Sequence, residues 1–132
     1  MKPELNVGDP PTVRHVFAYG TLIEPACLDA VLGHRHLGER LAARLAGYQR
    51  MRVPMYPYPY VVPTPGASVD GVLLMDLDPY DMQALDRYEE VESGFYRRET
   101  VEVEAWGCGP RPTYVQADVY AAGHQLLAAT AR

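Results

Sequence analysis

The most informative segment of the chain reads Leu85-Asp86-Arg87-Tyr88-Glu89-Glu90-Val91-Glu92-Ser93-Gly94-Phe95-Tyr96, where a short helix gives way to a strand. Met82 and Leu85 form the inward face of this helix at a spacing of three. At about 100° per residue, Glu89 returns to that face, whereas Glu90 is swung away from it. The spacing therefore predicts one glutamate that points inward and a neighbour that points outward.

An inward Glu89 has the properties of a general acid and base. It lies in the last helical turn, where the negative end of the helix dipole disfavours a carboxylate, and partial burial acts in the same direction. Both effects raise its pKa from the reference of about 4.3 toward neutrality, where a carboxyl transfers protons well. A frayed helix end with a hydrated Glu89 is the alternative from this segment alone.

A second informative segment lies near the N-terminus. Residues 13–19 are typical of a strand, and Tyr19-Gly20-Thr21-Leu22 then leads through Glu24-Pro25 into an apolar helix that closes at Gly33. The free N–H groups of such a turn form a cradle for an anion, and Gly20 lets a ligand approach the main chain closely. Either a carboxylate or a phosphate would fit, although the lysine and further glycines of a phosphate loop are missing.

Together and in this order, the two segments resemble the gamma-glutamyl cyclotransferase superfamily. That family carries a Tyr-Gly-Ser/Thr-Leu turn and a Leu-Asp-x-Tyr/Gln-Glu-Gly segment leading to Gly-x-Tyr. Here they stand as residues 19–22, 85–90 and 94–96, with Tyr56-Pro57 and Val69-Asp70-Gly71-Val72-Leu73 matching the intervening motifs. The resemblance covers about residues 13 to 121, and the chain's length suggests the compact, gamma-glutamylamine cyclotransferase-like branch. It implies an α+β fold, a small mixed β-barrel with flanking short helices.

The resemblance also implies a reaction, in which the glutamyl part of a gamma-glutamyl amine or amino acid cyclises to 5-oxoproline and the amine is released. Glu89 would be the general acid and base, and no cofactor or metal is implied. The substrate-binding residues carried over from the family are Tyr19, Gly20, Thr21, Leu22, Tyr96 and Tyr120. The identity of the leaving amine stays open, and we expect the proline-tyrosine segment and the region of Arg97 and Arg98 to set it.

Glu90 departs from the family pattern, which has glycine after the catalytic glutamate. An acid there could raise the pKa of Glu89 further, favour a cationic leaving group or mark a member that has lost activity. The last possibility keeps an alternative function open, that of a non-catalytic small-molecule-binding or interaction protein on the same fold.

Composition restricts the number of domains, the partners and the compartment that we expect for this chain. With 132 residues and 48% apolar content, the chain suits a single domain over residues 12–132 after a flexible, proline-containing lead-in at 1–11. A net charge of −5 without a basic stretch argues against nucleic acid or an anionic membrane as partner, and no segment has the roughly 20 apolar residues of a membrane span. Cys27 and Cys108 are isolated, as expected of reduced thiols in a cytoplasmic protein. The residues leave open whether it is a monomer or a homodimer.

The remaining segments predict mostly strands. Tyr96 and Tyr120 fall on the polar faces of two strands, so they face either solvent or a wet pocket. Residues 72–75 read as a central strand, and residues 37–48 have helical propensity although the family has strand there, which we follow. Prolines at 54, 57, 59, 63 and 65 predict a rigid loop beside the pocket. His34 and His36 are interpreted as surface residues and not as metal ligands.

Overall fold

The structure is a computed structural model that describes residues 13–52, 58–107 and 109–130. Within these ranges the chain forms five strands, three α-helices and one 3₁₀ helix. Their bounds are β1 Arg14–Ala18, η1 Thr21–Ile23, α1 Pro25–Leu32, β2 Arg40–Arg52, β3 Pro59–Leu77, α2 Pro79–Tyr88, β4 Tyr96–Trp106, β5 Thr113–Ala122 and α3 His124–Thr130. The predicted lead-in at 1–11 lies outside the described residues, and the single domain over 12–132 stays a prediction.

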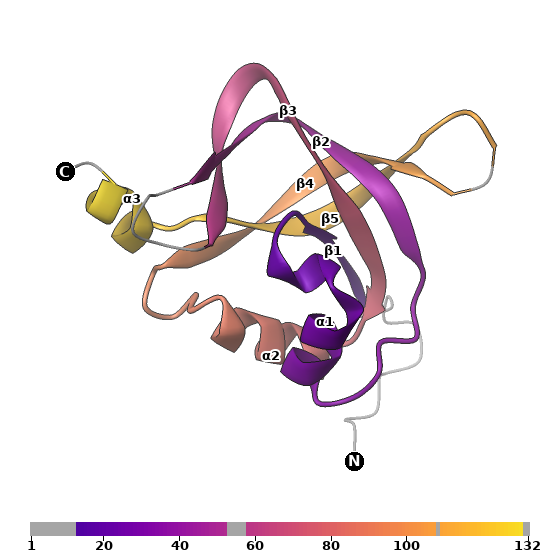
Figure 1. The fold of residues 1–132 in the computed structure, drawn as a ribbon, viewed down its shortest axis with the longest axis horizontal. Helices are drawn as coiled ribbons and strands as arrows, with labels where there is room; N and C mark the ends of the chain where they lie inside the picture. Colours follow the sequence, from indigo (N-terminus) through magenta and orange to yellow (C-terminus); the bar gives the residue numbers. More distant parts are fainter. Residues whose placement is uncertain (1–12, 53–57, 108, 131–132) are drawn as a thin grey trace, which may run out of the picture.

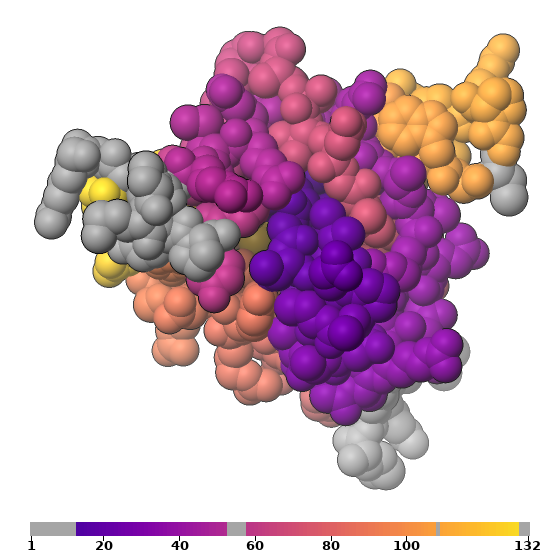
Figure 2. All heavy atoms as spheres, viewed as in Figure 1, coloured from indigo at the N-terminus to yellow at the C-terminus, as the bar shows by residue number. Residues whose placement is uncertain are grey.

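The five strands close into a mixed barrel in the order β1-β3-β2-β4-β5. Four of the pairings are antiparallel, and β1 closes the barrel by pairing in parallel with β5 at Val16 and Asp118. Helices α1 and α2 lie together at the lower side of the barrel, and α3 lies apart from them at the left of the view, against β4 and β5 (Figure 1). The ends of β4 and β5 project from the body as a hairpin (Figure 2). The predicted α+β barrel with short flanking helices is therefore confirmed.

Two apolar cores hold this arrangement. One gathers side chains of the barrel strands, and the other joins the barrel wall to the helices, including Leu28 of α1 and Leu85 of α2. Leu73 and Leu74 are both fully buried, yet they belong to different cores because successive strand residues point to opposite faces. Strand β3 also has neighbours on both edges here, so the prediction of a central strand at 72–75 is confirmed.

Residues 40–52 form strand β2 despite their helical propensity. Ala43 and Leu45 are buried, whereas Arg44 and Ala46 between and after them are exposed. The strand pairs with β3 on one edge and with β4 on the other, so tertiary hydrogen bonding outweighs a local preference worth a fraction of a kcal/mol per residue. The family-based prediction of a strand is confirmed.

The prediction of a proline-rich loop is wrong for residues 59–65, which form the first part of β3. Pro59 pairs with Arg52, and Pro63 pairs with Tyr48. The prolines at 59, 63 and 65 are an even number of residues apart, so their nitrogens lie on one edge of the strand. Strand β1 pairs only with the later part of β3, so this edge needs no N–H donors for that pairing. The earlier prolines, 54 and 57, lie outside the described residues.

The helix boundaries follow local chemistry. Gly33 ends α1 in the left-handed conformation, with φ of 78°. Asp78 caps α2 through the backbone N–H of Asp81, whose carboxylate in turn accepts from the N–H of Asp78. Met82 and Leu85 are buried, so the predicted inward face of α2 is confirmed. The reciprocal cap fixes the start of α2 and, through it, the position of Glu89 at the other end. None of the helices in the described residues has the length and apolar character needed to cross a membrane.

Candidate functional site

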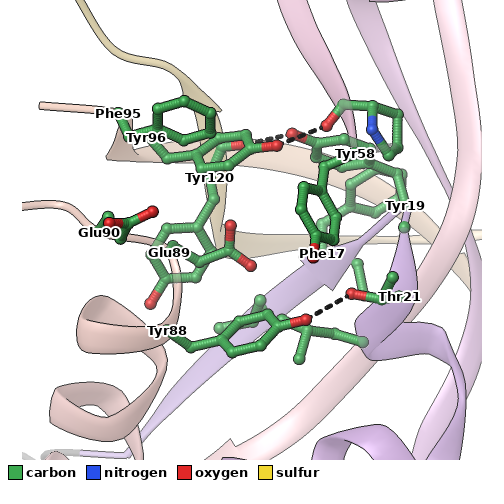
Figure 3. Close-up of a pocket in the computed structure, with 15 residues that line it drawn as sticks. Phe17, Tyr19, Thr21, Tyr58, Tyr88, Glu89, Glu90, Phe95, Tyr96 and Tyr120 are labelled. Carbon is green, nitrogen blue, oxygen red and sulfur yellow. Dashed lines mark hydrogen bonds between the residues drawn. The ribbon is translucent and has the colours of Figure 1, made fainter. Parts of the chain in front are cut away.

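A cavity of about 320 Å³ opens where the end of β1, the start of β3, the junction of α2 with β4, and β5 come together (Figure 3). This volume is at the lower end of the range typical of small-molecule sites. All seven predicted site residues line it, namely Tyr19, Gly20, Thr21, Leu22, Glu89, Tyr96 and Tyr120. The structure therefore brings together residues that are up to about a hundred positions apart in the chain, while their individual roles stay predictions.

Glu89 follows the last residue of α2, and its backbone N–H donates to the carbonyl of Leu85 at 2.9 Å. Its side chain is partly buried and points into the cavity, whereas the neighbouring Glu90 is exposed and lines the edge of the cavity (Figure 3). The inward orientation predicted for Glu89 is confirmed, whereas Glu90 is exposed and also lines the cavity, so it is not turned fully away.

Burial raises the pKa of Glu89 to about 7. The cause is the loss of hydration around the carboxylate, which disfavours its charged form. A carboxyl with such a pKa is present in both protonation states near neutral pH, so it can accept a proton in one step and donate it in the next.

The turn at the end of β1 faces the same cavity. The N–H of Ile23 donates to the carbonyl of Gly20 at 3.1 Å, which is the first hydrogen bond of η1. The N–H groups of Thr21 and Leu22 precede that bond, so they have no acceptor within the helix itself. Gly20 packs against Pro59 so closely that a Cβ at this position would lie 3.3 Å from the proline ring. The turn is thus a compact cradle of amide donors at the cavity wall.

Three tyrosine hydroxyls in the cavity donate to protein acceptors. Tyr19 donates to the carbonyl of Tyr120, Tyr96 donates to the carbonyl of Pro59 at 2.8 Å, and Tyr120 donates to Asp86 Oδ1 at 2.7 Å. Burial raises the pKa of all three phenols, so they stay neutral. Tyr96 and Tyr120 are buried and line the cavity, which resolves the predicted choice between solvent and pocket in favour of the pocket.

Two residues just before Glu89 were missed as site residues. Tyr88 lines the cavity, and its hydroxyl is 2.9 Å from Thr21 Oγ1, which joins the end of α2 to the turn (Figure 3). Asp86 accepts from Tyr120 and so joins the same helical turn to β5. The signal in the sequence was that both stand in the family segment at residues 85–90, but their partners are distant in the chain.

The region of Arg97 and Arg98 was expected to help set the leaving amine, but the two arginine side chains are engaged elsewhere. Arg97 pairs with Glu99 at 2.5 Å, and Arg98 pairs with Asp86 and the buried Asp118, each at 3.4 Å. Neither arginine lines the cavity. Other residues that line the cavity include Phe17, Phe95, and Tyr58 and Pro59 of the proline-tyrosine segment.

The two histidines serve the fold. His34 Nε2 lies 2.6 Å from Asp81 Oδ1, and His36 Nε2 lies 2.7 Å from the carbonyl of Met75. A backbone hydrogen bond at Arg35, and after it the hydrogen bond with Asp81, raise the pKa of His34. Across the residues described, no group of three or more His, Cys, Asp or Glu side chains is arranged to hold a metal ion.

The chain is thus a small α+β protein with a closed mixed barrel, whose cavity brings a turn with free amide donors and a carboxyl of raised pKa together among several aromatic side chains. A family model fits residues 16–131 of this chain, and the chain belongs to that family, described as gamma-glutamyl cyclotransferase, AIG2-like.

Individual relatives agree with this assignment. Protein AIG2 C of Arabidopsis thaliana is 30% identical over 93 residues, which are 70% of this chain and 53% of that protein. The chain thus spans about half the length of the curated relatives it matches. A solution structure of another Arabidopsis thaliana protein has a TM-score of 0.71 at 27% identity, covering 86% of this chain and 71% of that one. An AIG2-like protein from Mus musculus has the same fold, with a TM-score of 0.64 at 24% identity, covering 87% of this chain and 82% of that one.

Proposed function

We propose that the chain converts a gamma-glutamyl amine or amino acid to 5-oxoproline and a free amine, with Glu89 as general acid and base. In this reaction the α-amino nitrogen of the glutamyl part attacks its own side-chain amide carbonyl. A new C–N bond closes the five-membered ring, and the C–N bond to the leaving amine breaks. No water, oxidant or cofactor is consumed.

Glu89 supplies the proton transfers of this scheme. The α-amino group of the substrate is mostly protonated at neutral pH, with a reference pKa of about 7.7 to 8.0, so it must lose a proton before it attacks. The Glu89 carboxylate accepts that proton and delivers it to the leaving nitrogen. It then accepts the second proton, which the ring nitrogen loses on closure, and this proton leaves with the released amine as its ammonium ion. A pKa of about 7 for Glu89 is close to that of the amine, so the transfer is nearly balanced.

The walls of the cavity supply the positioning. The substrate α-carboxylate binds to the amide donors of Thr21 and Leu22, close to the side chain of Tyr88. This anchor keeps the flexible glutamyl chain curled with the amine near its own carbonyl. Well-oriented intramolecular reactions reach effective molarities of about 10⁵ to 10⁸ M, so holding the geometry provides much of the acceleration.

The observation that carries the proposal is the position of Glu89, a partly buried carboxyl of raised pKa that faces the amide cradle across one cavity. The direct test is 5-oxoproline release by the purified protein from a panel of gamma-glutamyl amino acids, glutathione and gamma-glutamyl-lysine, with Glu89→Gln alongside. Release that Glu89→Gln abolishes, with the fold retained by circular dichroism, supports the reaction.

The alternative is a non-catalytic small-molecule-binding or interaction protein on the same fold. Under it, the cavity binds gamma-glutamyl compounds, measured by calorimetry, while no compound of the panel releases 5-oxoproline. Release that Glu89→Gln leaves unchanged would instead show that another residue is the base.

We further propose a cytoplasmic protein, monomeric or homodimeric, whose partner is a small molecule. Cys27 is a free thiol in the structure, which fits a reducing compartment. Cys108 lies outside the described residues. Fractionation of cells and light scattering of the purified protein test the compartment and the oligomeric state.

A further inference from the structure

The residue after the proposed base is held in an unusual backbone conformation. Glu90 has φ of 53°, in the left-handed region that favours glycine. Its carbonyl is fixed there, because it accepts from the N–H of Phe95 and from the hydroxyl of Ser93, both at 3.1 Å. The loop therefore requires a conformation that any side chain makes less favourable, yet the chain has a glutamate. A residue kept at such a cost is a candidate for a functional role.

The side chain of Glu90 lines the cavity at its exposed rim. No hydrogen bond or ion pair is recorded for its carboxylate among the described residues, in contrast to Asp86 and Glu99, which have arginine partners. The described lining residues include two acids, Glu89 and Glu90, and no Lys, Arg or His. Among the described residues of the wall, the carboxylate of Glu90 thus presents a negative charge at the rim with no cationic side chain lining the cavity beside it.

The arrangement of groups across the cavity indicates which part of the substrate lies next to the Glu90 carboxylate. In the view of Figure 3, Glu89 lies between the turn that carries Thr21 on one side and Glu90 with Phe95 on the other. With the substrate α-carboxylate at the turn and the reacting atoms at Glu89, the leaving amine extends toward Glu90. The aromatic ring of Phe95 lines this part of the cavity as well, and an aromatic wall beside a carboxylate is well suited to a cation.

We propose that Glu90 is a specificity-determining residue that selects leaving amines carrying a second, protonated amino group, as in a mono-gamma-glutamyl derivative of an aliphatic diamine. This inference rests on the proposed function, because it assigns the leaving-group side of the same cavity. A leaving group with a carboxylate at that distance is disfavoured, since it would meet a like charge and no cation.

The test compares three substrates of matched length. These are the mono-gamma-glutamyl amide of 1,4-diaminobutane, gamma-glutamyl-n-pentylamide, which replaces the ammonium by a methyl group, and gamma-glutamyl-4-aminobutyrate, which ends in a carboxylate. Their kcat/KM values for 5-oxoproline release are measured with the wild-type protein, with Glu90→Gln and with Glu92→Gln. Glu92 is exposed on the same loop and does not line the cavity, so its substitution removes an equal charge without touching the site.

The wild-type protein is expected to prefer the diamine derivative over the pentylamide by at least about fivefold, the ratio equivalent to about 1 kcal/mol for a solvent-accessible ion pair. Glu90→Gln should reduce this ratio to near one, mainly through a higher KM for the diamine derivative, and should raise the relative rate for the carboxylate substrate. Glu92→Gln should keep the wild-type order.

The role of Glu90 and the proposed reaction can be contradicted separately. Release of 5-oxoproline with the same substrate ratios in the wild type and Glu90→Gln overturns the role of Glu90 and leaves the proposed reaction standing. A ratio lost equally in Glu92→Gln would show a general effect of loop charge and would also overturn it. No release from any of the three substrates, together with none from the earlier panel, overturns the proposed function and this inference with it.

Discussion

Replacing Glu89 by glutamine should make the protein more stable above pH 7 while removing its proposed activity. Ionisation of the Glu89 carboxyl lowers the unfolding free energy, because burial raises its pKa from 4.5 in the unfolded chain to about 7 in the fold. The folded state binds more protons than the unfolded state between these two values. The part of the unfolding free energy that depends on a protonated Glu89 is therefore fully present below pH 4.5 and is lost as the pH rises through 7.

The size of the effect follows from the two pKa values. At 1.36 kcal/mol for each tenfold change in proton affinity, a pKa that moves from 4.5 to about 7 corresponds to a loss of about 3 kcal/mol at high pH. Glutamine has nearly the same shape and does not ionise. The difference in unfolding free energy between Glu89→Gln and the wild type should thus grow from less than about 1 kcal/mol at pH 5 to about 3 kcal/mol at pH 8.5.

Urea unfolding followed by circular dichroism at the two pH values measures this difference. Glu92→Gln is the matched control, because it removes an exposed glutamate three residues away and should stay within about 0.5 kcal/mol of the wild type at both pH values. If Glu89→Gln gained no stability between pH 5 and pH 8.5, the carboxylate would be well hydrated in the fold, and the reasoning that makes it a base near neutral pH would fail.

Three other predictions concern the surroundings of Glu89. Glu90→Gly should raise the unfolding free energy by about 1 kcal/mol, because it relieves the left-handed conformation; an unchanged urea midpoint would contradict this. Tyr120→Phe removes the hydrogen bond to Asp86 and leaves a partly buried acceptor, so it should lower the unfolding free energy by about 1 to 3 kcal/mol. It should also lower kcat for 5-oxoproline release more than it raises KM, and wild-type kinetics would exclude a positioning role for Tyr120. Gly71→Ala should lower the melting temperature by more than about 5 °C, because the new Cβ would overlap the carbonyl oxygen of Ala18 across the β1–β3 pair; calorimetry that shows no change would refute this packing.

Local rules were sufficient where neighbouring residues in the chain determine the structure. The cap at Asp78, the apolar spacing of Met82 and Leu85, and 3.6 residues per turn together place Glu89 on the inner side of α2. The glycine turn at Gly20 and the left-handed end of α1 at Gly33 follow in the same way. These interactions span a few residues each, so the order of residue types carries the information.

At Glu90, the structure explains a motif position that the sequence alone left open. The family pattern expects glycine there, and the sequence alone left three meanings for the substitution. The backbone supplies the reason for the glycine, a φ of 53° that glycine adopts at little cost. The structure also shows that the glutamate lines the cavity, which turns an anomaly in the motif into a hypothesis about the substrate.

The sequence by itself determined the helix caps, the strand alternation and the two motifs that face one another across the cavity. The family resemblance indicated a strand over residues 40–52 against their local helical propensity, and the tertiary contacts explain why it forms. Only the tertiary structure decided that the prolines at 59, 63 and 65 lie within β3, and that Tyr88 and Asp86 connect the end of α2 to Thr21 and Tyr120. The physical reason is the same in each case. These outcomes depend on hydrogen bonds and packing between segments that lie far apart along the chain, and the free energy of those contacts outweighs local preferences that are each worth about 1 kcal/mol or less.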